Sequence, residues 1–320
     1  MRLRSIFVVL TIIWVFLLPA HSEAIQVEPG QYERVLIHDG IHRTYILHIP
    51  PQYDPQKAFP LVLLFHGGTG NAKQALDNYG LVEKANREGF VLVAPNGTGR
   101  LKKIMLTWNV GFGFGYAMSH NIDDIGFTRK LIQAIEDTIS IDPKRIYATG
   151  ISNGGILCHF LAAELSDKIA AIAPVVATIG GKKSSNEQYI LPPRPKEAVS
   201  VIAFNGLLDE RIPYSGGIQK KSVGKPVWVK SAQETQAFWV VVDHCTSRPR
   251  IEVNKNDEYE KITYGRCIND SEVIQYLIIN QGHAWPGGKK PRLGADTPSK
   301  TVNATDLMWE FFKKHPKLGG

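Results

Sequence analysis

The sequence of 320 residues has only three cysteines, no internal repeat and no low-complexity segment. Its lysines and arginines are scattered, so the formal net charge of +7 does not indicate a nucleic-acid surface. No segment reaches the ~20 consecutive apolar residues that a membrane-spanning helix requires. With 43% apolar and 21% charged residues, the composition is that of a globular chain, which excludes disordered, collagen-like and coiled-coil proteins.

The longest apolar run lies at the amino terminus. Residues 6–18 are almost entirely apolar; they follow the basic residues Arg2 and Arg4, and small residues come before position 25. This layout predicts a signal peptide over residues 1–24 and a secreted protein, extracellular or periplasmic, over residues 25–320. The alternative is an uncleaved amino-terminal anchor, since no other segment could hold the chain in a membrane.

An exported chain with three cysteines can form one disulfide and keep one thiol. Cys245 and Cys267 lie among polar residues, and a bond between them would close a loop of about 20 residues, worth roughly 3 kcal/mol in the chain-entropy model. Cys158 lies in an apolar segment with no positioned base, which predicts a buried, unreactive thiol.

Short apolar runs bounded by Gly, Pro and Asn alternate with segments of helical period, as in a largely parallel sheet. Helices are predicted over residues 124–140, from Asn153 to Glu164, and after an N-cap at Asn303. The central strands are apolar throughout, so helices should cover both faces of the sheet. The sequence thus predicts one α/β domain, with strands at residues 45–49, 61–65, 90–94, 145–149, 199–204 and 273–279.

In two long segments, residues 99–121 and 180–195, the apolar residues follow neither the helical nor the strand period. We expect both to be loops. Long loops in compact domains often have a function, although an irregular connection explains the second segment equally well.

The segment from Arg145 to Gly155 contains a strand, the pattern G-x-S-x-G and the start of an apolar helix. This is the arrangement of a nucleophile elbow, in which a serine occupies a strained turn between a strand and a helix. Gly150 and Gly154 leave the room that such a turn needs. Ser152 is therefore the predicted nucleophile.

A serine hydroxyl becomes nucleophilic when a histidine takes its proton, and that histidine needs a carboxylate on its other ring nitrogen. After a nucleophile elbow, the chain order is Ser, Asp, His. Asp209 follows a buried strand and is the predicted acid. Glu210 is a competing carboxylate, and Asp243 competes more weakly because it follows a helical segment.

His283 follows the strand at residues 273–279, beside glycines that let it turn toward the serine, and is the predicted base. His66 also follows a buried strand, where we expect it to position a turn. Acyl transfer further needs two backbone N–H donors for the oxyanion. Gly68 and Asn153 fit these two roles. Thr69 is the neighbour that could replace Gly68, and it is also a candidate substrate-binding residue.

With these residues, the chain resembles the secreted esterase family that groups polyhydroxybutyrate depolymerases with bacterial feruloyl and acetylxylan esterases, serine esterases similar to carbohydrate esterase family 1. The resemblance implies an α/β-hydrolase fold, secretion, a triad of Ser152, Asp209 and His283, and a disulfide between Cys245 and Cys267. It rests on the motifs Leu64–Gly68, Ala94–Gly97, Thr107–Asn109, Asp123–Phe127, Thr149–Gly155, Ile212–Gly217, Gly282–Gly288 and Trp309–Phe312.

Two positions depart from the family pattern. Asn205 stands where relatives usually have His, and Gly113-Phe114 stands where many relatives have adjacent cysteines, which affects the loop beside the site. Trp285 is a candidate aromatic wall for a phenolic or polymer acyl group, with packing inside the turn as the equal alternative. Trp108 is a second candidate for the same role.

We therefore predict a secreted serine carboxylic ester hydrolase, a monomer that needs no cofactor or metal. The expected substrates are feruloyl or acetyl esters of plant cell-wall polysaccharide, or a small phenolic ester; hydroxyalkanoate polyester is the first alternative. A peptidase would use the same residues, and a non-catalytic polysaccharide-binding relative would have the fold without turnover. We expect neither nucleic acid nor, after signal cleavage, a membrane as a partner.

Overall fold

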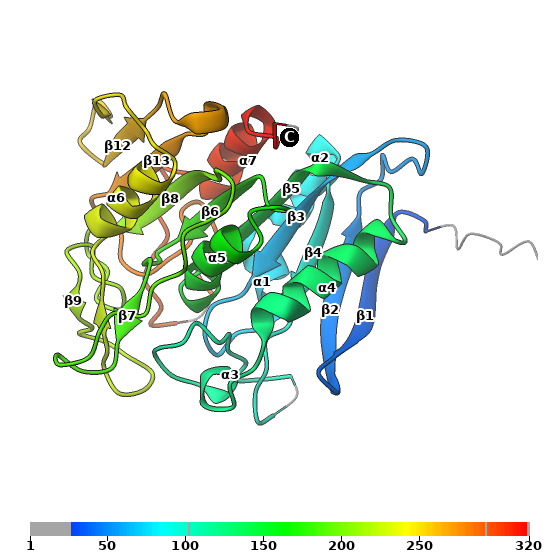
Figure 1. Ribbon diagram of the computed structural model, residues 1–320, viewed down its shortest axis with the longest axis horizontal. Helices are drawn as coiled ribbons and strands as arrows, with labels where there is room; N and C mark the ends of the chain where they lie inside the picture. Colours follow the sequence, from blue (N-terminus) through cyan, green and yellow to red (C-terminus); the bar gives the residue numbers. More distant parts are fainter. Residues whose placement is uncertain (1–26, 102, 292, 319–320) are drawn as a thin grey trace, which may run out of the picture.

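The computed structural model describes residues 27–101, 103–291 and 293–318 (Figure 1). The predicted signal peptide, residues 1–24, lies outside the described residues. Within the described ranges, no helix is both long and apolar enough to cross a membrane.

A ten-stranded sheet forms the centre of the protein, in the order β1-β2-β4-β3-β5-β6-β8-β13-β12-β11 (Figure 1). Neighbouring strands from β4 to β13 in this order are parallel, whereas the strands added at both edges are antiparallel. The bounds are β1 Gly30–His38, β2 Ile41–Ile49, β3 Phe59–Phe65, β4 Val91–Pro95, β5 Ile141–Ile151, β6 Ala171–Val175, β8 Ser200–Gly206, β11 Arg250–Val253, β12 Tyr259–Tyr264 and β13 Val273–Ile278.

Helices cover both faces of the sheet, as the apolar central strands predict (Figure 1). One hydrophobic cluster joins the sheet to α4, α5 and α6, and a second cluster on the other face joins it to α1, α2 and α7. A short helix, α3, lies in the loop after β4. The bounds are α1 Ala72–Tyr79, α2 Leu81–Glu88, α3 Tyr116–Ser119, α4 Asp124–Glu136, α5 Asn153–Glu164, α6 Ala232–Val242 and α7 Ala304–Lys314.

All six predicted strands are present, and α5 has the predicted bounds. Helix α4 ends at Glu136 rather than at residue 140. Helix α7 begins after Asn303, whose side chain accepts the backbone amide of Asp306 at 3.1 Å, as an N-cap does. Strand β6 was not predicted, because its buried sequence of alanines and Pro174 has little β-propensity.

The two segments predicted as loops are largely irregular. The described residues of the segment 99–121 form α3 and isolated bridges, such as the pairing of Leu101 with Ile104. Residues 180–195 contribute β7, Gly181–Lys182, to a second small sheet with β10, Trp228–Val229, and β9, Gly217–Ile218.

A disulfide joins Cys245 to Cys267 and ties the end of α6 to the end of β12. Cys158 is buried in α5 with a free thiol. Burial raises the pKa of this thiol well above its usual value, which agrees with the unreactive cysteine expected from the sequence.

Candidate active site

Ser152 lies between β5 and α5 in a strained backbone conformation. Its φ of 55° and ψ of −122° lie in a region that side-chain-bearing residues rarely occupy. Its amide donates to the carbonyl oxygen of Val175 at 2.9 Å, which holds the turn against β6. The strain therefore occurs at the residue predicted to be the nucleophile.

The glycines around Ser152 are required by close backbone contacts. A Cβ atom on Gly154 would lie 2.5 Å from the carbonyl oxygens of Phe65 and His66. A Cβ atom on Gly150 would lie 2.7 Å from the Phe65 oxygen. Because carbon and oxygen atoms cannot approach so closely without a bond, only glycine fits at either position. The G-x-S-x-G pattern thus has the steric basis that the sequence suggested.

Asp209 and His283 meet at the carboxyl ends of β8 and β13. Nδ1 of His283 and Oδ2 of Asp209 are 2.7 Å apart, and Asp209 is only 4% exposed. The other carboxylate oxygen accepts the amides of Arg211 at 2.8 Å and Ile212 at 2.9 Å. The carboxylate therefore holds a proton on Nδ1 and leaves Nε2 as the basic nitrogen.

Ser152 follows β5 at the same sheet edge, so all three residues lie at the carboxyl ends of parallel strands, where open α/β sheets place their sites. Within the described part of the chain, neither Oγ of Ser152 nor Nε2 of His283 has a hydrogen-bond partner. Both atoms are thus unoccupied by competing contacts. Catalytic hydrogen bonds are often long in a resting site and shorten when substrate binds.

The two competing carboxylates lie elsewhere. The Glu210 side chain is 44% exposed and pairs with Lys221. Asp243 ends α6, and its Oδ1 accepts the amide of Val199, just before the start of β8. Asp243 thus lies at the opposite ends of the strands from His283, so Asp209 is the carboxylate that contacts the histidine.

The loop with His283 is held by a carboxylate that the sequence analysis missed. Oδ2 of Asp296 accepts the backbone amide of His283 at 2.6 Å. A Cβ atom on Gly282 would lie 2.5 Å from the same oxygen, so glycine is needed there. Gln281 accepts the Ser299 amide at 2.7 Å and links the loop to the same segment. No local motif marks Asp296, because its contact depends on how the chain returns after His283.

The loop after β3 shows which amide can bind an oxyanion. The Thr69 amide donates to the carbonyl oxygen of Leu106 at 2.7 Å and is therefore engaged. The amides of Gly68 and Asn153 have no acceptor among the described residues. This contrast favours Gly68 over Thr69, the alternative that the sequence left open.

His66 and Asn153 fix this loop through buried hydrogen bonds. Nε2 of His66 accepts the Gly97 amide at 3.0 Å, and its Nδ1 donates to the carbonyl oxygen of Gly67 at 2.8 Å. Burial lowers the pKa of His66 to about 4, so the ring is neutral at pH 7 and can make both bonds. The Asn153 side chain bonds both backbone polar groups of Trp108. This network agrees with the expected role of His66 in positioning a turn.

The two predicted aromatic walls are buried instead of facing a substrate. Trp285 is 2% exposed; its ring stacks on Tyr79 at 4.3 Å and donates to Oγ1 of Thr305 at 3.0 Å. Trp108 is fully buried, and its indole donates to the carbonyl oxygen of His66 at 2.8 Å. The packing alternative for Trp285 is therefore the one that the structure favours, and both rings support the loops around the site.

A different aromatic ring lies beside Gly68. A Cβ atom on Gly68 would be 2.8 Å from Cζ of Phe114, and a Cβ on Gly224 would be 2.8 Å from Cβ of the same residue. Phe114 is half-buried, whereas its neighbour Phe112 is packed in the core. The irregular sequence of residues 99–121 indicated that a residue near the site could come from this loop. It did not indicate which of Phe112 and Phe114 lies beside Gly68.

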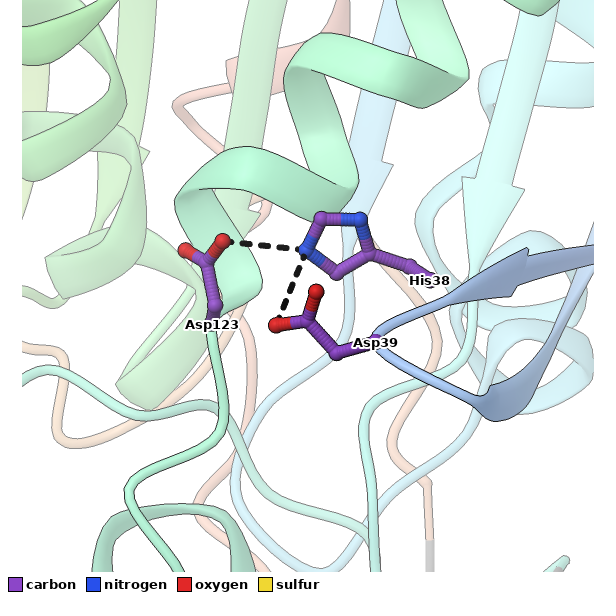
Figure 2. A group of neighbouring side chains, drawn as sticks. All are labelled: His38, Asp39 and Asp123. Carbon is purple, nitrogen blue, oxygen red and sulfur yellow. Dashed lines mark hydrogen bonds and ion pairs between the residues drawn. The ribbon is translucent and has the colours of Figure 1, made fainter.

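One group of side chains has the composition of a metal site. The ligand atoms of His38, Asp39 and Asp123 lie within 4.8 Å of one another, and Figure 2 shows Nε2 of His38 facing both carboxylates. Asp123 is also the N-cap of α4: its Oδ1 accepts the Gly126 amide at 2.8 Å, and its Oδ2 lies 2.9 Å from His38. These contacts explain the group as a helix cap with an ion pair.

Comparisons with known proteins relate the chain to esterases. No family model matches the sequence. The chain is 29% identical over 248 residues to feruloyl esterase B of Piromyces equi, which covers 77% of this chain and 44% of the relative. It is 22% identical over 301 residues to the probable feruloyl esterase C of Aspergillus niger, which covers 89% of this chain and 90% of the relative. The chain thus spans less than half the length of the Piromyces relative.

Among solved structures, the acetyl xylan esterase from Aspergillus awamori matches with a TM-score of 0.61 at 13% identity, over 89% of this chain and 99% of that chain. This likeness confirms the α/β-hydrolase fold predicted from the sequence. The curated relatives confirm the resemblance to feruloyl esterases, which are carboxylic ester hydrolases.

Proposed function

We propose that this chain, a relative of the feruloyl esterases, is a serine carboxylic ester hydrolase that acts on esters of plant cell-wall polysaccharide. The observation that supports it most is the 2.7 Å contact of buried Asp209 with His283, at the same sheet edge as a serine in a strained turn. A histidine oriented by a carboxylate, at the same sheet edge as a half-buried serine in a strained turn, is the arrangement used for acyl transfer.

In the first half of the reaction, Oγ of Ser152 attacks the ester carbonyl carbon while Nε2 of His283 takes the hydroxyl proton. Asp209 stabilises the imidazolium that forms. The amides of Gly68 and Asn153 donate to the oxyanion of the tetrahedral intermediate, where one such donor is typically worth about 3 kcal/mol. The intermediate collapses, and His283 returns the proton to the departing alcohol.

In the second half, a water molecule attacks the acyl-enzyme carbonyl and gives a proton to Nε2 of His283. The second tetrahedral intermediate is held by the same two amides. Its collapse breaks the bond to Oγ of Ser152, which regains its proton, and releases the carboxylic acid. Every proton thus moves through one nitrogen atom of His283.

The acyl group would contact Phe114. Its ring lies against Gly68, whose amide is proposed to bind the oxyanion, so an acyl chain attached to the same carbonyl carbon must pass close to it. A phenolic acyl group can pack on such a ring, with an offset or edge-to-face contact worth about 1 kcal/mol. The position of the Phe114 ring beside Gly68 therefore favours feruloyl esters as substrates and makes Phe114, in place of the predicted tryptophans, the candidate aromatic wall.

Polyester is the second candidate, and exposed leucines favour it. Leu207 is 42% exposed and Leu208 is 60% exposed, in the turn that leads to Asp209. Leu101, Ile104 and Met105 are each more than half exposed in the loop after β4. Apolar side chains around a site can adsorb to an apolar polymer.

The test compares hydrolysis of methyl ferulate, acetylated xylan and amorphous polyhydroxybutyrate by the wild type and by Ser152→Ala. We expect the substitution to lower kcat roughly 10⁴-fold or more, because the nucleophile is removed. Equal rates would contradict the esterase proposal and leave the non-catalytic, polysaccharide-binding alternative. Faster hydrolysis of methyl ferulate or acetylated xylan would favour plant esters as substrates, and faster hydrolysis of polyhydroxybutyrate would favour polyester. Casein cleavage, measured in parallel, tests for peptidase activity.

Export through a signal peptide at residues 1–24 belongs to this proposal, since plant cell-wall polysaccharides lie outside the cell that makes the enzyme. The monomeric state also stays a prediction.

A further inference from the structure

A cavity of about 1020 Å³ opens between the β1–β2 hairpin and the loop after β4. None of the candidate catalytic residues or oxyanion donors lines it. We call it the hairpin pocket and define it by Glu33, Arg34, Thr98, Lys103 and Tyr116. Its volume lies at the upper end of the range for small-molecule sites, which is enough for an oligosaccharide segment.

Only one loop separates the hairpin pocket from Ser152. On one side of this loop, a Cβ atom on Gly67 would lie 3.7 Å from Cβ of Ser152. On the other side, Gly97 lines the pocket and donates its amide to His66, the residue before Gly67. The hairpin pocket and Ser152 thus lie on two sides of the same loop, and a polymer that passes over this loop would bring an ester to Ser152 while a neighbouring unit occupies the pocket.

An aromatic ring lines the hairpin pocket. Tyr116 stacks on His120 at 3.7 Å, so its ring is held in place. A sugar ring has an apolar face that can pack on such a ring.

The charge of the hairpin pocket favours an anion. Among the described residues, Arg34 and Lys103 have no acidic partner within 4.0 Å, while Lys73 is paired with Asp77 at 2.6 Å. Glu33 is the single acidic residue among those that line the cavity. A ligand carboxylate could form charge-assisted hydrogen bonds with the two unpaired cations.

We propose that the hairpin pocket binds a uronic-acid-bearing segment of the polysaccharide whose ester is hydrolysed at Ser152. The polymer context rests on the proposed function, but binding of the segment requires no hydrolysis. The pocket would thus select polysaccharide that has acidic side groups close to its esters.

Calorimetric titration tests this with two unesterified ligands: a xylo-oligosaccharide with one glucuronic acid substituent and the unsubstituted oligosaccharide of the same length. We expect the acidic ligand to bind the full chain at least tenfold more tightly, because a charge-assisted hydrogen bond contributes about that much. Lys103→Glu should weaken its binding at least tenfold. Lys255→Glu, the same charge reversal in the exposed turn between β11 and β12, should leave the affinity unchanged.

A second variant tests the neutral part of the pocket. Tyr116→Ala removes the ring that lines the pocket, and it should weaken binding of both oligosaccharides about fivefold. Equal affinity for the two ligands, no measurable binding, or no effect of Lys103→Glu would each overturn the proposal. Methyl ferulate hydrolysis is measured on the same preparations. Hydrolysis without oligosaccharide binding overturns only the pocket proposal, and binding without hydrolysis overturns only the esterase proposal.

Discussion

Asp209 and Asp243 are both buried aspartates, but they lie at opposite ends of β8 and have different surroundings. Asp209 accepts hydrogen bonds from Arg211, Ile212 and His283. Asp243 is completely buried, its carboxylate accepts only the Val199 amide at 3.3 Å, and its Oδ2 has no partner among the described residues.

The comparison shows that the donors around a buried carboxylate decide what it can do. Removal from water raises the pKa of Asp243 to about 7, because one weak hydrogen bond does not replace its hydration. At Asp209, two amides and an imidazole face the carboxylate oxygens, which is the arrangement needed to stabilise a positive charge on His283. Four substitutions test this difference, in order of expected effect.

The largest effect is expected from Asp209→Asn. The amide has nearly the same shape, but its NH₂ group can hold the wrong tautomer of His283 and cannot stabilise the imidazolium. We expect kcat on methyl ferulate to fall roughly 10⁴-fold, or about 5 kcal/mol. Asp243→Asn is the matched control and should keep kcat within about twofold. A loss of less than tenfold in Asp209→Asn would show that His283 works without this carboxylate.

Asp243→Asn is expected to change stability instead of activity. Its folded pKa of about 7 lies above the unfolded value of 3.8, so the folded state keeps a proton that the unfolded state releases. The contribution of Asp243 to wild-type stability therefore falls as the pH rises from about 4 to about 7 and is constant above that.

The variant lacks this loss and should be more stable than the wild type at pH 8, by at most about 4 kcal/mol, with the difference shrinking toward pH 4. Urea unfolding at both pH values, with the disulfide intact, measures it. A difference that does not depend on pH would contradict the proton linkage.

Asp296→Ala should have a smaller effect on activity. The substitution frees the His283 amide without touching the ring, so the imidazole is less well positioned. We expect kcat to fall about tenfold with KM changed less than threefold, since a misplaced catalytic group affects the chemical step. Asp296→Asn keeps an acceptor oxygen and should restore most of kcat. A change confined to KM would instead indicate a role in substrate binding.

Glu210→Gln should have the smallest effect. Its side chain is nearly half exposed, and its ion pair with Lys221 is of the exposed kind that contributes little. We expect changes below about 0.5 kcal/mol in stability and below twofold in kcat. A large loss of activity would make Glu210 the acid and overturn the assignment of Asp209.

The features that the sequence predicted are those with a local cause. The turn around Ser152 is set by glycines two residues away on either side, and the central strands are set by continuous apolar runs. Asp209 and His283 could be found because each directly follows such a strand. Helix α7 was found from its N-cap, which is also a local contact.

The features that were missed depend on residues distant in the sequence. Trp285 is buried because Tyr79 and Thr305 pack around it. The choice between Gly68 and Thr69 stayed open because the Thr69 amide is engaged by Leu106, which belongs to another loop. Strand β6 is identified by its neighbours β5 and β8, since its own alanines and proline do not have a strand pattern. The periodicity of apolar residues along the sequence cannot predict such contacts, because each joins residues that become neighbours only when the chain folds.

The position of β13 has a consequence for the order of assembly. This strand lies between β8 and β12, yet it is synthesised after both. The β11–β12 hairpin, which the disulfide ties to α6, reaches the main sheet only through β13. The last strand to leave the ribosome therefore joins the outer hairpin to the centre and delivers His283 at the same moment. A chain that has not yet added β13 would have the serine turn but no His283 beside Asp209, so the candidate site is complete only after the sheet has closed.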